Sequence, residues 1–161
     1  MARFIALDPS STVTGWAAFQ DESLIAWGKI DTSKLQFAER FSFIIDELSR
    51  LAAQFGATEI AIEDVKFAWA GKNRNRNIMG LQAVFRSVKD WAAGMEYPFA
   101  PYNPASWKNA IVGNSHATKE TTIENIYLRF DGIPKNLSEH EADAIAIGCY
   151  HASLKKYQKG G

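Results

Sequence analysis

Two acidic residues, Asp8 and Glu63, stand where the sequence predicts that two strands end. Asp8 follows the apolar run at residues 4–7, and Glu63 ends a strand predicted over residues 59–63. If the two strands are parallel neighbours, both carboxylates emerge at the same carboxyl edge of the sheet. Ligands of open α/β sheets bind near such edges. This edge is therefore the predicted position of an acidic site.

Asp143 and His140 could complete that site from a helix. Asp143 lies in the otherwise apolar run of residues 142–149, and His140 precedes it by three residues. This spacing places both side chains on one helical face. A carboxylate in an apolar run costs free energy unless a charged or hydrogen-bonding group meets it.

Each of these residues also has an ordinary structural explanation. Asp8 suits the turn of an Asp-Pro-Ser-Ser loop, and Glu63 suits an exposed strand end. Asp143 would be stabilised by the dipole of a nearby helix N-terminus. Glu141 has capping-box spacing from Ser138, so we do not count it as a ligand. The joint occurrence of three acids and a histidine at matching positions nevertheless favours a metal site.

Such a site suits phosphodiester hydrolysis. That reaction must activate water and stabilise charge on the attacking and leaving oxygens, which two metal ions about 4 Å apart can do together. Mg²⁺ prefers carboxylate oxygens. A histidine among the acids could bind a metal ion or transfer a proton.

The pattern of apolar residues predicts an α/β fold with three antiparallel strands, two further strands and several helices. The strand predicted over 59–63 follows a helix, so it should run parallel to the first strand. Thr32 or Ser33 is predicted to cap the first helix, Asn103-Pro104 to begin a short helix, and Ser138 to cap the last. The predicted strands cover residues 4–7, 14–19, 24–30, 59–63 and 97–102, and the predicted helices end near residues 55, 93, 111, 130 and 156.

Length and composition bound the class of protein. The 161 residues carry a formal net charge of zero, one cysteine and 47% hydrophobic residues. They suit one compact domain over residues 1–161, with no apolar run long enough to cross a bilayer. We expect a protein of a reducing, cytoplasmic compartment without an internal disulfide or membrane contact.

One basic segment stands out in this neutral chain. Residues 67–89 contain no acid, and Phe67 and Trp69 lie among the cations. Cations here could bind backbone phosphates, and the aromatic rings could stack on unpaired bases. The alternatives are a solvated helix face for the charges and core packing for the rings. The predicted DNA-binding residues of this segment are Lys66, Phe67, Trp69, Lys72, Arg74 and Arg76.

Five stretches of the chain resemble, in order, the motifs of the RuvC family of Holliday junction resolvases. The ordered set spans nearly the whole chain and is much more specific than any single motif. The stretches are residues 5–17 (Asp-Pro-Ser-Ser, then Thr-Gly), 61–65 (Ala-Ile-Glu-Asp-Val), 102–113 (similar to the family's Pro-x-x-Val-Lys stretch ending in Gly), 117–120 (Ala-Thr-Lys-Glu) and 140–148 (His-Glu-Ala-Asp-Ala).

The resemblance implies a ribonuclease H-like fold, with a five-stranded mixed sheet flanked by helices. It also implies a homodimer that cuts four-way DNA junctions with Mg²⁺, for which Mn²⁺ could substitute, at two ions per site. By position, Asp8, Glu63, His140 and Asp143 would be the catalytic and metal-binding residues. Lys108 and Lys119 would approach the phosphate.

The chain departs from the family pattern in two places. Ser10 stands where the family usually has glycine, and a basic stretch at residues 71–76 follows the second acidic motif. The basic stretch bears on substrate selectivity more than on chemistry. This divergence suits a phage-type member acting in a bacterial cell or a phage-infected host.

Two other functions remain open on the sequence alone. A nuclease of the same fold could cut other branched DNA or RNA–DNA hybrids, because fold does not decide substrate. A non-catalytic junction-binding module is the second alternative, against which the complete set of acidic positions argues. An actin-like kinase needs two such domains, for which this chain is too short.

Overall fold

The computed structural model describes residues 1–65 and 76–160. The predicted DNA-binding residues Lys66, Phe67, Trp69, Lys72 and Arg74 lie outside these ranges, and Arg76 is the first residue of a helix. The elements are β1 (Arg3–Asp8), β2 (Val13–Gln20), β3 (Ser23–Asp31), α1 (Phe37–Phe55), β4 (Ile60–Glu63), α2 (Arg76–Gly94), β5 (Phe99–Tyr102), α3 (Pro104–Val112), α4 (Lys119–Arg129) and α5 (Glu139–Lys159).

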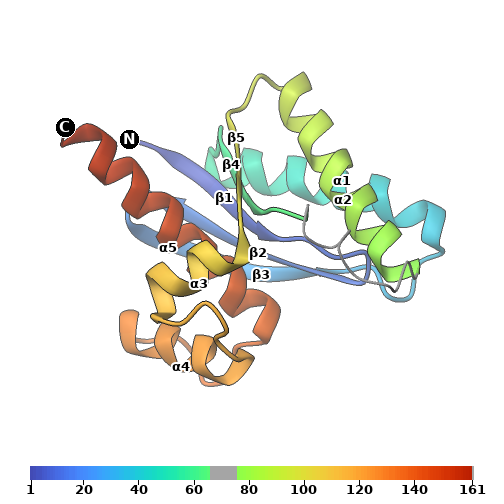
Figure 1. Ribbon diagram of the computed structural model, residues 1–161. Helices are drawn as coiled ribbons and strands as arrows, with labels where there is room; N and C mark the ends of the chain where they lie inside the picture. Colours follow the sequence, from blue (N-terminus) through green and yellow to red (C-terminus); the bar gives the residue numbers. More distant parts are fainter. Residues whose placement is uncertain (66–75, 161) are drawn as a thin grey trace.

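The strands form one five-stranded sheet in the order β3-β2-β1-β4-β5 (Figure 1). β2 pairs antiparallel with both β1 and β3, because short turns join these three strands. β4 pairs parallel with β1, and β5 pairs parallel with β4, because a helix precedes each of them. The predicted α/β fold, with three antiparallel strands and two parallel additions flanked by helices, is confirmed.

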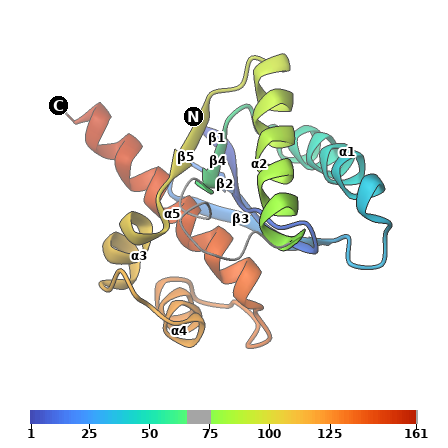
Figure 2. The same ribbon diagram turned by 45° about the vertical axis from the view of Figure 1, so that its right-hand side comes forward.

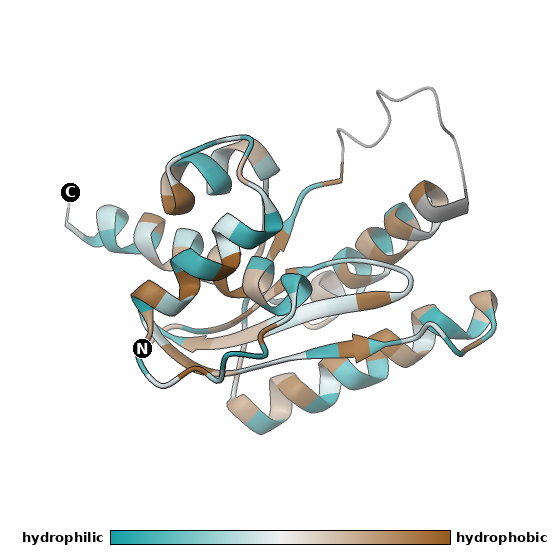
Figure 3. Cartoon of the chain, turned by 90° about the horizontal axis from the view of Figure 1, so that it is seen from below, coloured by the Kyte–Doolittle hydropathy of each residue, from teal (hydrophilic) through white to brown (hydrophobic). Residues whose placement is uncertain are grey.

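Alternating residues of the central strands face two separate cores. Ile5 and Leu7 of β1 pack with α1 and α2, whereas Phe4 and Ala6 pack with α3, α4 and α5. The two groups of helices cover opposite faces of the sheet (Figures 1 and 2). Polar and apolar segments alternate along the helices, as expected of helices with one buried face (Figure 3). None of the helices described here is long and apolar enough to span a membrane.

Helix caps were predicted correctly at two places and wrongly at a third. Asn103 caps α3, and Ser138 caps α5 in a capping box. The prediction that Thr32 or Ser33 caps α1 is wrong, because α1 begins at Phe37 after Gln36, which makes no side-chain cap. Thr32 is buried, and its hydroxyl donates instead to the carbonyl of Ser11 at 2.7 Å. It therefore secures the loop that follows β1.

A part-buried polar network centred on His151 fastens α5 to the sheet. Nδ1 of His151 bonds to the hydroxyl of Tyr102 at 2.5 Å, and its Nε2 contacts Glu59, which also binds Lys155. Since a carboxylate only accepts hydrogen bonds, Nε2 carries the proton and the neutral ring accepts from tyrosine at Nδ1. Burial lowers the pKa of His151, which agrees with a neutral ring. This network fixes where α5 lies along the sheet.

Close contact between α5 and β2 depends on Gly148. A Cβ atom added at this glycine would lie 2.1 Å from Cε2 of Phe19, far inside van der Waals contact. The ring of Phe19 is buried and stacked on Phe4, with ring centroids 5.1 Å apart, so it has little room to move. The glycine lets the helix approach the sheet more closely than any side chain would allow.

We expect Gly148→Ala to destabilise the protein by about 1–3 kcal/mol, the usual cost of overpacking a core, although alanine is the better helix former. Gly94→Ala, at the end of α2, is the matched control, because an added Cβ there meets nothing within 4 Å. Chemical denaturation of both variants measures the difference. Equal stabilities of the two variants would contradict the close-packing argument.

Candidate active site

Two carboxylates meet at the carboxyl edge of the parallel strands. Leu7 and Ile62 are register partners in β1 and β4, so Asp8 and Glu63 follow at the same level. Both side chains lie on the α5 face of the sheet, because they alternate with Leu7 and Ile62 on the opposite face. The arrangement follows from parallel pairing of two strands that each end in an acid.

α5 brings Asp143 and His140 to the same edge. Oδ2 of Asp8 lies 3.5 Å from Nδ1 of His140, and the charge of Asp8 acts on Asp143. Asp8, Glu63, His140 and Asp143 thus come from three elements to one place, hereafter the acidic edge. Their metal-binding role remains a prediction.

The N-terminal turn of α5 can reach this place only because Gly15 has no side chain. Gly15 is the register partner of Asp8 on β2. A Cβ atom at this position would lie 1.9 Å from the carbonyl oxygen of His140. The backbone of α5 therefore rests directly on β2, beside the end of β1.

Hydrogen bonds hold the turn after Asp8 in shape. The backbone N–H of Ser10 donates to Oγ1 of Thr14 at 3.2 Å, and this hydroxyl donates back to the carbonyl of Ser10 at 2.8 Å. Arg40 donates from α1 to the carbonyl of Ser11 at 3.1 Å. The strand end that carries Asp8 is thus braced on both sides, with serine at the position where the family usually has glycine.

Burial and mutual repulsion raise the pKa values of the acids. Burial raises the pKa of Glu63 to about 8, with repulsion from Asp8 second. The same causes, in the same order, raise the pKa of Asp143 to about 7. Burial also raises the pKa of Asp8, against the hydrogen bond to His140, which lowers it. That bond in turn raises the pKa of His140. Protons or cations must therefore accompany these carboxylates at neutral pH.

This donor set fits a hard divalent cation. Carboxylate oxygens are suitable ligands for Mg²⁺ or Mn²⁺, and a cation would relieve the repulsion that adds to burial in raising the pKa values. As the side chains of the described residues stand, no three His, Cys, Asp or Glu converge closely enough to enclose an ion.

The sequence did not predict that Trp107 and Glu139 would lie at this site. Nε1 of Trp107 donates to Oε1 of Glu63 at 3.0 Å. Glu139 lies between Nε2 of His140, 3.6 Å away, and Nζ of Lys119, 3.0 Å away. A tryptophan in a short helix beside the site could have been suspected, since a buried indole usually needs an acceptor. Nothing in the spacing of Glu139 distinguishes it from an ordinary first-turn acid.

Both predicted phosphate lysines line a cleft beside Asp143. The cleft measures about 410 Å³, and its walls come from α3, α4 and the start of α5. Lys108 is close enough to lower the pKa of Asp143, whereas the exposed Lys119 pairs with Glu139. The lining residues are Lys108, Ala117, Thr118, Lys119, Glu120, Thr122, Glu139 and Asp143.

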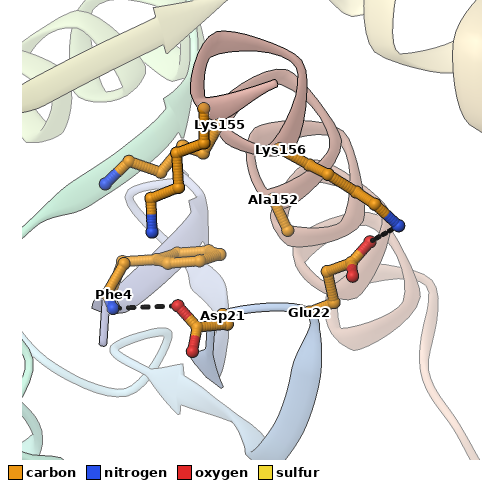
Figure 4. Close-up of a pocket in the computed structure, with 8 residues that line it drawn as sticks. Phe4, Asp21, Glu22, Ala152, Lys155 and Lys156 are labelled. Carbon is orange, nitrogen blue, oxygen red and sulfur yellow. Dashed lines mark hydrogen bonds and ion pairs between the residues drawn. The ribbon is translucent and has the colours of Figure 1, made fainter.

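A second cavity, of about 180 Å³, lies near the C-terminal end of α5 and is a poorer candidate (Figure 4). Phe4 and Ala152 form its apolar lining, and lysines and acids form the rest. Two of its acids already have partners, since Lys156 lies 3.5 Å from Glu22 and Asp21 accepts from the backbone N–H of Ala2. The acidic edge remains the predicted site.

The family model and the relatives of similar sequence all indicate the same family. The model of the family "Crossover junction endodeoxyribonuclease RuvC" matches residues 4–151. The chain is 31% identical to the Idiomarina loihiensis RuvC, over 94% of this chain and 88% of the relative. It is 29% identical to the RuvC of a Wolbachia from Brugia malayi, over 96% of each chain.

Solved structures agree in fold. The structure of Thermus thermophilus RuvC in complex with a Holliday junction substrate superposes with a TM-score of 0.82 at 21% identity, covering 98% of this chain and 97% of that chain. The yeast mitochondrial Holliday junction resolvase superposes with a TM-score of 0.61 at 13% identity, covering 98% of this chain and 82% of that chain. The family model, the relatives and the shared fold together establish that this chain belongs to the crossover junction endodeoxyribonuclease RuvC family.

Proposed function

We propose that this protein is a metal-dependent endonuclease that resolves four-way DNA junctions by paired symmetric nicks. The observation that carries the proposal is the acidic edge, where buried carboxylates with raised pKa values adjoin a cleft lined by lysines. Membership of the RuvC family supports the substrate. Residues 1–161 would act as one nuclease domain, in the cytoplasm of a bacterium or of a phage-infected host.

Asp8, Glu63, His140 and Asp143 would hold two Mg²⁺ ions, for which Mn²⁺ could substitute. When bound, such ions activate water and stabilise charge on the phosphate oxygens. His140 can contribute in either of two ways, as a ligand or as the holder of a proton for the leaving oxygen. Its contact with Asp8 favours the protonated ring.

The lysines would place the DNA backbone at the acidic edge. Lys108 faces the cleft beside Asp143, so a phosphate bound to Lys108 would lie close to the carboxylates. Lys119 could exchange its pairing with Glu139 for a phosphate, because that pair is exposed and contributes little to stability. Lys66, Lys72, Arg74 and Arg76 are proposed to bind further phosphates, and Phe67 or Trp69 to stack on an unpaired base.

A homodimer would present two such sites to the two strands of a symmetric junction. The face of α2 that points away from the sheet supports this proposal. Met79 is 65% exposed there, and a groove of about 800 Å³ runs along the helix.

We expect Asp143→Asn to reduce cleavage of a four-way junction by roughly 100-fold or more, because the loss of a single outer-sphere group already costs up to that much in metal sites. Asp46→Asn, an exposed acid on α1, is the matched control and should cut normally. The assay compares labelled four-way, Y-shaped and linear DNA, with Mg²⁺ and with chelator.

The products distinguish the alternatives. Paired symmetric nicks in the four-way junction alone, dependent on metal and on Asp143, are the expected result. Equal cutting of all branched forms would indicate a broader branched-DNA nuclease. Tight junction binding without any cutting would replace the proposal with a binding module.

The raised pKa values predict how the metal requirement depends on pH. Protons compete with the cation for Glu63, with a pKa of about 8, and Asp143, with a pKa of about 7. Lowering the pH from about 8.5 to about 6.5 should therefore raise the half-saturating Mg²⁺ concentration about 10-fold or more. Cleavage rates over a Mg²⁺ titration at each pH measure it. A requirement independent of pH would refute the competition.

The dimer is tested by light scattering after gel filtration. Wild type should elute with twice the mass of one chain, and Met79→Glu should increase the monomer fraction, because it buries a charge at the proposed interface. Met95→Glu is the control, since Met95 is also exposed but lies beyond the end of α2. A wild-type protein that is monomeric both alone and on junction DNA would rule the dimer out.

A further inference from the structure

Trp107 contacts the carboxylate of Glu63 from a different element of the fold. The side chain of Trp107 is fully buried, and its Nε1 donates to Oε1 of Glu63 at 3.0 Å. The indole is only a donor, and an ionised carboxylate is only an acceptor. The contact therefore favours ionised Glu63, in opposition to the burial and repulsion acting on the same group.

Local backbone structure fixes the indole in this position. Glu63 and Tyr102 are register partners, and α3 begins just after Tyr102. Asn103 caps the helix by accepting from the backbone N–H of Ala105 at 2.9 Å. The backbone N–H of Trp107 in turn donates to the carbonyl of Asn103 at 3.3 Å. A capped helix anchored on the neighbouring strand therefore carries the indole to Glu63.

The same indole ring contacts the lysine that faces the cleft. Nζ of Lys108 lies 5.5 Å from the ring centroid of Trp107, within the range of a cation–π interaction. Lys108 also acts electrostatically on Glu63 and Asp143. One buried ring thus touches both an acid of the acidic edge and the cation beside it.

We propose that Trp107 is a positioning residue that holds Oε1 of Glu63 and leaves Oε2 to bind a metal ion. The proposal rests on the metal site proposed above. A carboxylate held at one oxygen cannot turn freely or bind an ion with both oxygens equally, so Glu63 would act as a ligand of fixed direction. In the Pro-x-x-Val-Lys pattern that this stretch resembles, valine stands at this position and has no donor to offer.

The first test measures Mn²⁺ binding without any DNA. Trp107→Phe keeps a buried, though smaller, aromatic ring and removes the N–H donor, and we expect its Mn²⁺ dissociation constant to rise about 10-fold, as for other outer-sphere partners of metal ligands. Trp91→Phe is the matched control, because the ring of Trp91 packs on Tyr97, next to α2. Electron paramagnetic resonance of free Mn²⁺ gives both constants. Equal affinity in folded Trp107→Phe and wild type would overturn the proposal.

A second test needs no change at Trp107 and so does not depend on the folding of that variant. The protein has five tryptophans, whose indole ¹H–¹⁵N signals can be assigned by nuclear magnetic resonance. Glu63→Ala should move the Trp107 signal more than any other indole signal, and Mn²⁺ added to wild type should broaden it. A Trp107 signal that does neither would overturn the proposal.

These measurements separate the positioning role from the proposed function. Weaker Mn²⁺ binding by Trp107→Phe in a protein that cuts no junction would support the positioning role and reject the nuclease. Junction cleavage by wild type, with Mn²⁺ affinity unaffected by Trp107→Phe, would support the nuclease and reject the positioning role. A wild-type protein that binds no Mn²⁺ would overturn the positioning role as well.

Discussion

Burial of neighbouring carboxylates, to which their mutual repulsion adds, is the main physical constraint on this molecule. Parallel strand pairing and the crossing of α5 place Asp8, Glu63 and Asp143 close together. In this environment the pKa of each carboxyl is higher than its ordinary value. Such an arrangement has a cost in folding free energy, which natural proteins accept at functional sites. The donors around these acids, from His140 and Trp107, offset only part of that cost.

α5 is the element on which this arrangement depends most. Its first turns carry His140 and Asp143, and its second half carries His151, which the sheet holds through Glu59 and Tyr102. The apolar core between these two ends makes the helix a rigid connection. The stability of the far end is thus part of what sets the position of the acids.

The fold was largely predictable, because strand ends, apolar alternation and cap residues are local signals. The placement of Asp8 and Glu63 at one edge of the sheet followed from two parallel strands that each end in an acid. The contacts of Trp107 and Glu139 were not predictable, because they depend on side chains that meet across elements. The prediction that Thr32 caps α1 was wrong for a similar reason, because the hydroxyl of Thr32 donates a hydrogen bond to the carbonyl of Ser11, which is distant in the sequence.

Gly15 has a consequence for how this gene can change over time. The backbone of α5 rests on this glycine, and an added Cβ would meet the carbonyl of His140 at 1.9 Å. Every single-base substitution of a glycine codon that is not silent either adds a side chain or stops translation. The amino acid at this position is therefore closed to neutral drift, and the lineage can change its side chains only where the backbone leaves space for them.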